Sequence, residues 1–146
     1  MRRVTTLSEY VRRRNGLALG AQGSLQAMLY RAFGAGRFSE FWHYWNPIWG
    51  YYLARYVMRP LSSYCPSPVA IVMTFVVSGA LHDLAIMLLK WRVSVFFSFW
   101  FFLMGLLVVI TEAVEVRYHT RPWWLRGTIN LSFVLLPLAL TQWVLG

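Results

Sequence analysis

The sequence has few charged residues and almost no cysteine. Cys65 is the only cysteine, which excludes an internal disulfide and a metal site built from cysteines. Charged residues make up 13% of the chain, about half of what is usual in a soluble protein. The chain also lacks a glycine-rich phosphate loop, a metal-ligand spacing, a nucleophile elbow and an internal repeat. These absences argue against a soluble domain and against several familiar classes of enzyme site.

Apolar and aromatic side chains are abundant instead. Hydrophobic residues make up 58% of the 146 residues and aromatic residues 18%, with eight tryptophans. A chain of this length is expected to form one domain. Tryptophan and tyrosine are enriched where a membrane meets water. The composition therefore predicts an all-α integral membrane protein.

Three apolar stretches are long enough to cross a bilayer as helices, at residues 69–89, 93–110 and 127–145. The first has 21 residues and would be about 31 Å long, which matches a hydrocarbon core of about 30 Å. A shorter helix is predicted over residues 47–59, where Pro60 would stop it. It would reach only about 20 Å, so we expect it to lie at the interface.

Basic residues are concentrated at the start of the chain, where seven of the fourteen precede Glu40. Residues 17–36 place Leu25, Met28, Leu29 and Phe33 on one helical stripe, which predicts an amphipathic helix on the membrane surface. The chain would then divide into a basic membrane-surface segment, residues 1–37, and a transmembrane core, residues 38–146. Anionic membrane lipids are the expected partner of the basic segment, and no nucleic acid is expected.

The positions of the arginines orient the predicted spans. If the 47–59 helix does not cross, only Lys90 and Arg92 lie on the side opposite the basic N-terminal segment. The positive-inside rule favours this arrangement, with a cytoplasmic N-terminus and an external C-terminus. No cleavable signal peptide is expected, and a bacterial inner membrane is the expected location.

His82 and Asp83 lie inside the first predicted span. Ionisable residues within a membrane are costly and usually have a function. Ser78 and Gly79 share a face with His82 and would let a ligand or another helix approach. A buried neutral imidazole there could act as a general base, or it could only hydrogen-bond across a helix pair. Asp83 is rotated about 100° from His82 and is expected to pair with an arginine or a partner subunit.

Asn46 ends a block of aromatic residues and precedes Pro47, a pattern that predicts a helix cap. Its alternative role is contact with a substrate carbonyl. His43 and His119 are expected at the polar surface, and we do not favour haem ligation by His43 and His82. Glu112 and Glu115 are expected to meet nearby arginines.

The ordered set F-W-H-Y-W-N at 41–46, T-F-V-V-S-G at 74–79 and L-H-D at 81–83 resembles the membrane-bound O-acyltransferase family. The similarity covers roughly residues 38–90, and the chain resembles the C-terminal core of that family. The resemblance implies transfer of an acyl chain from acyl-CoA, or from an acyl carrier, to a hydroxyl group. It implies His82 as general base and Asn46 as a second catalytic residue, with Trp45, Ser78 and Gly79 at the substrate. No metal and no cofactor are implied, since acyl-CoA is a co-substrate.

Two functions follow from this resemblance. The first is a membrane-embedded acyltransferase in lipid metabolism. The second is a non-catalytic membrane subunit or scaffold derived from the same fold. Three spans do not easily enclose both a donor passage and an acceptor chamber, so a homo-oligomer or a partner membrane subunit is expected in either case.

Overall fold

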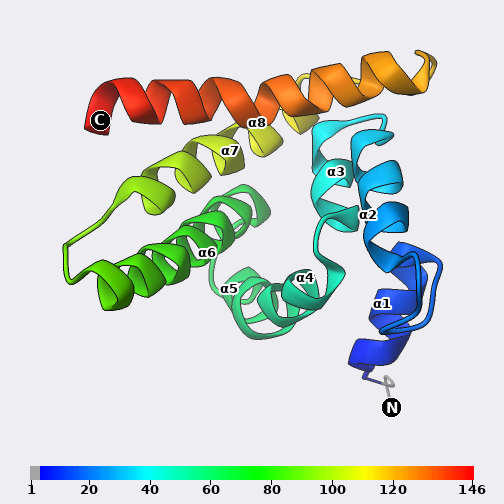
Figure 1. The fold of residues 1–146 in the computed structure, drawn as a ribbon, viewed down its shortest axis with the longest axis horizontal. Helices are drawn as coiled ribbons and strands as arrows, with labels where there is room; N and C mark the ends of the chain where they lie inside the picture. The colour runs from blue at the N-terminus through cyan, green and yellow to red at the C-terminus, as the bar shows by residue number, and fades with distance from the viewer. Residues whose placement is uncertain (1–3) are drawn as a thin grey trace.

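The computed structural model describes residues 4–146, and the basic residues Arg2 and Arg3 lie outside this range. The described chain is helical and contains no strand (Figure 1). Its elements are α1 (Leu7–Asn15), α2 (Ser24–Phe33), α3 (Phe38–Tyr44), α4 (Pro47–Leu53), the π-helical turn η1 (Ala54–Met58), α5 (Arg59–Ser62), α6 (Ser67–Lys90), α7 (Phe96–Ala113) and α8 (Trp123–Leu145). The predicted all-α fold is confirmed.

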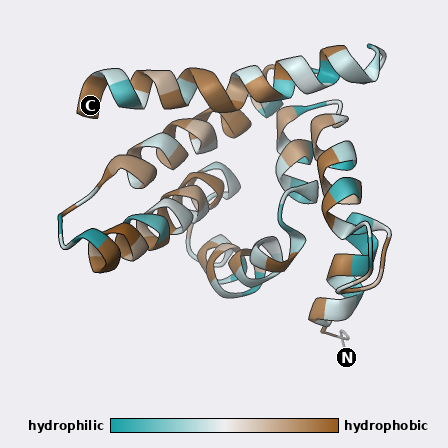
Figure 2. Cartoon of the chain, viewed as in Figure 1, coloured by the Kyte–Doolittle hydropathy of each residue, from teal (hydrophilic) through white to brown (hydrophobic). Residues whose placement is uncertain are grey.

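Helices α6, α7 and α8 are long and apolar enough to cross a membrane, and no other described helix is. They have 24, 18 and 23 residues and correspond to the three predicted spans. Figure 2 shows that hydrophobic residues dominate these helices, whereas hydrophilic bands interrupt α1 and α2. The predicted count of three spans is therefore confirmed, although their ends differ by a few residues.

The three long helices run alternately up and down. The α6–α7 connection and the C-terminus lie together at one end, and α1, α2 and α3 lie at the other end (Figure 1). Helices α6 and α7 form a tight antiparallel pair because glycines allow close approach. A Cβ atom at Gly79 would collide with the carbonyl oxygen of Phe97, and one at Gly105 would lie 3.0 Å from the Cβ atom of Phe75. Small residues serve the same purpose in many membrane helix pairs.

Asp83 fastens α6 to the first turn of α7. Its side chain is buried, and its carboxylate accepts from the hydroxyl of Ser94 at 2.8 Å and from the amide of Phe97 at 3.0 Å. The amide and the hydroxyl of Ser98 donate to the other oxygen, each at 2.7 Å. A helix N-terminus has unpaired amide hydrogens and a positive dipole end, so a carboxylate is well placed there. Among the described residues Asp83 makes no ion pair, and the expected pairing with an arginine is wrong.

Helix α8 binds the C-terminal end of α2. Asn130 is fully buried, and its amide nitrogen donates to the carbonyl oxygens of Phe33 at 3.0 Å and Ala35 at 2.9 Å. One turn earlier, Arg126 donates to the carbonyl of Gly34 at 2.6 Å. The last carbonyls of a helix lack partners within the helix. Side chains of α8 supply those partners, and this fixes the N-terminal helices against the spans.

The predicted helix over residues 17–36 is shorter in the structure, where α2 begins only at Ser24. A further helix, α1, lies before this range, and a turn separates the two. Thr6 and Glu9 form a reciprocal capping box at the start of α1. Gly16, Gly20 and Gly23 all have positive φ angles, which L-residues rarely adopt. The glycines therefore interrupt the predicted helix, and only the stripe over α2 remains helical.

The helix predicted over residues 47–59 also differs from its prediction, because Pro60 does not stop it. The helical path continues through η1 and α5 as far as Ser62. A π-helical turn is wider than an α-helical one. Pro60 then falls in the first turn of α5, where the absence of its N–H has little cost.

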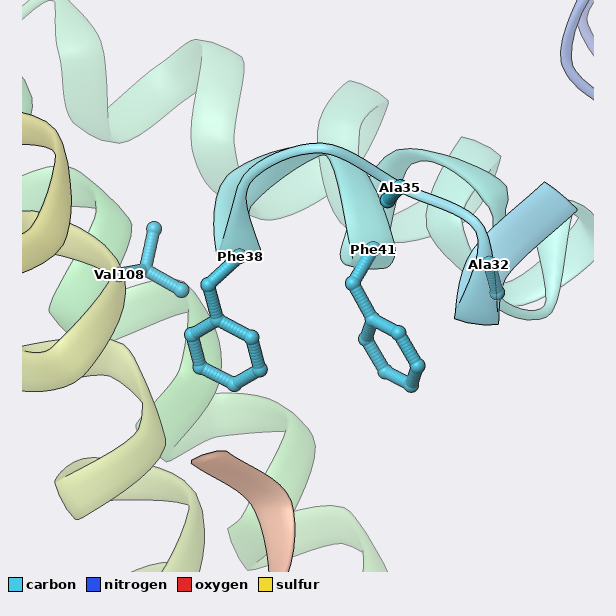
Figure 3. Packing of buried hydrophobic residues seen from close by; sticks show 5 residues of the cluster. All are labelled: Ala32, Ala35, Phe38, Phe41 and Val108. Carbon is cyan, nitrogen blue, oxygen red and sulfur yellow. The ribbon is translucent and has the colours of Figure 1, made fainter. Parts of the chain in front are cut away.

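A small apolar core lies where α3 meets α7. Phe38 and Phe41 are fully buried and point the same way from α3, with Phe38 facing Val108 of α7 (Figure 3). Nearby, Glu112 accepts from Ser39 at 2.6 Å and forms ion pairs with arginines, as the sequence predicted. Glu115 makes no ion pair among residues 4–146. This contact area holds α3 in place and forms one end of the cavity described next.

Candidate functional site

A cavity of about 390 Å³ lies between the spanning helices and the shorter N-terminal helices. Five helices and the π-helical turn contribute lining residues, and most of these are apolar or aromatic. Ligand sites in proteins typically have such volumes and such linings, with a few polar groups. The cavity contains four of the five residues predicted for the site, namely His82, Asn46, Trp45 and Ser78.

Helix α6 forms one wall through a single stripe of side chains. The lining residues are Ile71, Thr74, Phe75, Ser78 and His82, at helical spacings of three and four. From Ile71 to His82 the stripe extends about 16 Å along the helix axis. Its polar members lie among aromatic and aliphatic ones. A chain-like ligand could therefore lie along α6 and reach His82.

Helices α3 and α4 form the facing wall. From α3, Ser39, Trp42 and His43 line the cavity on one helical face. Trp49 of α4 crosses to α6, where its indole nitrogen donates to the hydroxyl of Ser78 at 2.9 Å. This bond holds α4 against α6 and places Trp49 beside His82.

His82 has aromatic neighbours and a defined hydrogen bond. Its ring centroid lies 5.5 Å from that of Phe97, 5.1 Å from that of Phe101 and 6.0 Å from that of Trp49. Its Nδ1 atom lies 2.6 Å from the carbonyl oxygen of Ser78. A carbonyl oxygen only accepts, so Nδ1 carries the proton in a neutral ring. Nε2 then has a free lone pair, and no described residue donates to it.

The expected burial of His82 is wrong for the isolated chain. The residue is exposed, whereas Ser78, one turn earlier, is buried. Trp49 covers the helix at Ser78, but no part of α4 closes over the whole imidazole. The ring therefore lies at an open edge of the cavity, where a substrate can approach it.

Asn46 caps α4 as predicted. Its side-chain oxygen accepts from the amide of Trp49 at 3.3 Å, and Pro47 begins the helix. Its φ angle of 42° lies in the left-handed region, which asparagine tolerates better than most residues. The cap uses only the amide oxygen. The NH₂ group has no partner among the described residues, so it remains available to a ligand in the cavity.

Gly79 does not line the cavity. It faces the backbone of α7 at Phe97 and Ser98, so it has a packing role, and direct contact with a substrate is not supported by its position. Trp45 lines the cavity and stacks on Phe41 at 5.6 Å between centroids. Ser78 also lines it, but its hydroxyl is already bonded to Trp49.

Three titratable residues of the cavity were not expected there. Tyr10 and Arg14 come from α1, one turn apart, and the Arg14 guanidinium lies 5.0 Å from the Tyr10 ring centroid. His43 is the third; it is exposed, as expected of a surface residue, and it also lines the cavity. Desolvation by surrounding protein atoms, helped by the charges of Arg14 and Arg37, lowers the pKa of His43 below its usual value. Only the spacing of Tyr10 and Arg14 hinted that they share a face.

No group of three or more histidine, cysteine or acidic side chains that could hold a metal ion occurs in the part of the chain that the structure describes. Comparison with family models, with curated proteins and with solved structures found no match to this chain. Evidence on function therefore comes from the cavity and its side chains.

Proposed function

We propose that this protein is a membrane acyltransferase in which His82 removes the proton from an acceptor hydroxyl group. The observation that carries this proposal is the hydrogen bond from Nδ1 to the carbonyl of Ser78. It orients the imidazole and leaves the basic Nε2 atom without a protein partner. General bases in enzymes are most often histidines held in this way.

The proposed reaction is the conversion of a thioester into an oxygen ester. Nε2 of His82 accepts the hydroxyl proton while the oxygen attacks the carbonyl carbon of the acyl thioester. The C–O bond forms, the C–S bond breaks, and the leaving thiolate takes up the proton from His82. The imidazole is thereby returned to its neutral state, and no oxidant or reductant is required.

The NH₂ group of Asn46 is suited to bind the carbonyl oxygen as negative charge develops on it. Such donors act most strongly where water is excluded. The cavity lining is largely apolar, with Phe75, Phe101 and Trp45 among its members. The same surfaces offer contacts to an acyl chain.

The donor in this proposal is acyl-CoA or an acyl carrier, which would reach the cavity from the cytoplasmic side, where the N-terminus is predicted. The acceptor is a hydroxyl compound at the membrane. A second copy of the chain or a partner membrane subunit would cover the open edge beside His82. The enclosure needed for dry chemistry would then come from the assembly.

The exposure of His82 supports a second candidate function, a non-catalytic membrane subunit that holds a lipid in the cavity. In that case the histidine would contribute only to packing or to contact with a partner. The two functions differ in what they require of Nε2, and this difference can be tested.

The test is the substitution His82→Asn. The asparagine NH₂ group can replace Nδ1 as the donor to Ser78, but no basic atom replaces Nε2. Purified protein in mild detergent is incubated with radiolabelled acyl-CoA and a membrane lipid extract, and labelled ester is counted. We expect His82→Asn to lower the transfer rate about 10²–10⁴-fold.

His119→Asn is the matched control, because His119 is an exposed histidine outside the cavity. It should leave transfer unchanged. If His82→Asn retains full transfer, or if the wild-type protein transfers nothing alone or with its co-purified partners, the enzyme proposal is wrong. Retention of lipid by such a protein would then support the subunit function.

A further inference from the structure

Arg14 places a permanent positive charge in an otherwise mostly apolar cavity. It lines the cavity from the last turn of α1. Its guanidinium carbon lies over the ring of Tyr10, which also lines the cavity. The remaining charged or titratable side chains of the lining are His43 and His82. At neutral pH the cavity therefore has a net positive charge.

No carboxylate among residues 4–146 neutralises Arg14. Glu40 pairs with Arg37 at 3.2 Å, and Glu112 is bonded to Ser39 and close to two other arginines. The Nε atom of Arg14 is buried and has no hydrogen-bond partner. Buried donors in folded proteins are normally satisfied, so an unpaired one calls for an explanation.

We propose that Arg14 binds the phosphate group of an elongated ligand whose reacting end lies at His82. Guanidinium groups bind phosphate strongly because their N–H groups match its oxygens in geometry and charge. Arg14 and His82 come from different walls, and α4 contacts both sides: a Cβ atom on Gly50 would lie 3.6 Å from the hydroxyl of Tyr10, and the ring centroid of Trp49 lies 6.0 Å from that of His82. The ligand must therefore carry its anionic group at a distance from its reacting atom and have an uncharged segment between the two.

This inference rests on the proposed function for the identity of the reacting end. Two reactants have the required chemistry: the donor, which carries phosphate on the arm of its carrier, and a membrane lipid with a phosphate headgroup. Both would place phosphate at Arg14 and an uncharged chain along α6. The experiment below distinguishes them.

Binding is measured with the full chain in an uncharged maltoside detergent, through the fluorescence of its tryptophans, of which Trp42, Trp45 and Trp49 line the cavity. The probes are coenzyme A, oleoyl lysophosphatidic acid, monooleoylglycerol and inorganic phosphate. Lysophosphatidic acid and monooleoylglycerol differ by one phosphate group. We expect Arg14→Gln to weaken binding of a phosphate-bearing probe about tenfold or more and to leave monooleoylglycerol unchanged.

Two further variants keep the result interpretable. Arg14→Lys keeps the charge but not the planar group, and should restore part of the affinity. Arg12→Gln removes an equal charge from an exposed position on the same helix and should change nothing. Unchanged binding of monooleoylglycerol shows that the cavity remains folded.

If Arg14→Gln weakens only the binding of coenzyme A, the phosphate belongs to the donor. If it weakens only the binding of lysophosphatidic acid, the phosphate belongs to the lipid. Either outcome supports the site. The proposed phosphate site is overturned if Arg12→Gln and Arg14→Gln weaken probe binding equally. It is also overturned if inorganic phosphate binds as tightly as coenzyme A or lysophosphatidic acid. If binding depends on Arg14 but no transfer occurs, the proposed function fails and the anion site stands. If transfer depends on His82 but binding ignores Arg14, only this inference fails.

Discussion

Two sets of polar side chains in this molecule differ in what they bind. Asp83 and Asn130 are fully buried, and each binds the end of another helix. In the cavity, the Nε atom of Arg14 and the indole nitrogen of Trp42 are buried without partners, and Nε2 of His82 has none among the described residues. The first set satisfies the protein's own backbone. The second set retains unused hydrogen-bonding capacity, which is what a ligand site requires.

His82 and Asp83 are adjacent in sequence, yet they belong to different sets. The helix turns by about 100° between them, so one faces the cavity and the other faces α7. A single span thus carries a structural polar residue and a candidate catalytic one without conflict. Substitutions in the first set should cost stability, and substitutions in the second should cost mainly function.

The largest loss of stability is expected for Asp83→Ala. It leaves two amides and two hydroxyls at the start of α7 without their acceptor. We expect the free energy of unfolding to fall by about 3–5 kcal/mol, as when other buried charge interactions are broken. Unfolding in mixtures of sodium dodecyl sulfate and maltoside detergent measures this. Asp83→Asn keeps one acceptor oxygen and should lose less; equal loss would show that the charge, not the acceptor count, holds the pair.

Asn130→Ala should have the next largest effect. It removes the donor shared by the carbonyls at the end of α2 and the acceptor of the Tyr118 hydroxyl. We expect a loss of about 2–3 kcal/mol, and faster amide hydrogen exchange in α2 than in α6. Thr141→Val is the matched control, since Thr141 is equally buried on α8 but bonds only within its own helix. If the two variants are equally stable, Asn130 does not hold α2 in place.

Asn46 belongs to both sets, and two substitutions separate its roles. Asn46→Ala removes the cap of α4 and should cost about 1–2 kcal/mol. Asn46→Asp keeps the capping oxygen and should stay within about 0.5 kcal/mol of the wild type. If the NH₂ group binds the reacting carbonyl, both variants lose transfer about 10²-fold. Full transfer by Asn46→Asp would limit this residue to capping.

The smallest effect concerns His43 and pH. Its pKa in the folded protein lies below the usual value of 6.5 because of desolvation and the charges of Arg14 and Arg37. The unfolded chain therefore binds a proton at a higher pH than the folded one does. Stability should fall as the pH drops through about 6.5 and level off once the folded ring is also protonated. Histidine NMR titration gives the pKa, and His43→Gln should remove this part of the slope. A midpoint above 6.5 would contradict the prediction.

The number of span-length helices could be predicted because hydrophobic length and composition determine it. The cap at Asn46 could be predicted because an asparagine before a proline is a local signal. His82, Asn46, Trp45 and Ser78 were expected at one site, and all four line one cavity. Local patterns sufficed for the spans and the cap, and the family resemblance implied the grouping of these four residues.

Features that depend on distant packing could not be predicted. Asp83 binds backbone amides of α7, and a backbone amide has no sequence signature. Arg14 enters the cavity only because α1 packs on α4, which no spacing within α1 reveals. The exposure of His82 depends on where α4 crosses α6. In each case the deciding neighbour lies on another element, so the sequence near the residue carries no information about it.

The cap on α7 has a consequence for how the chain enters a bilayer. Ser94 and Ser98 follow Asp83 by eleven and fifteen residues, so α6 is synthesised before the groups that satisfy its carboxylate. A lone α6 would carry an unsatisfied acid into hydrocarbon, which is costly. Pairing with α7 removes this cost, so we expect α6 and α7 to enter the bilayer together as a two-helix hairpin.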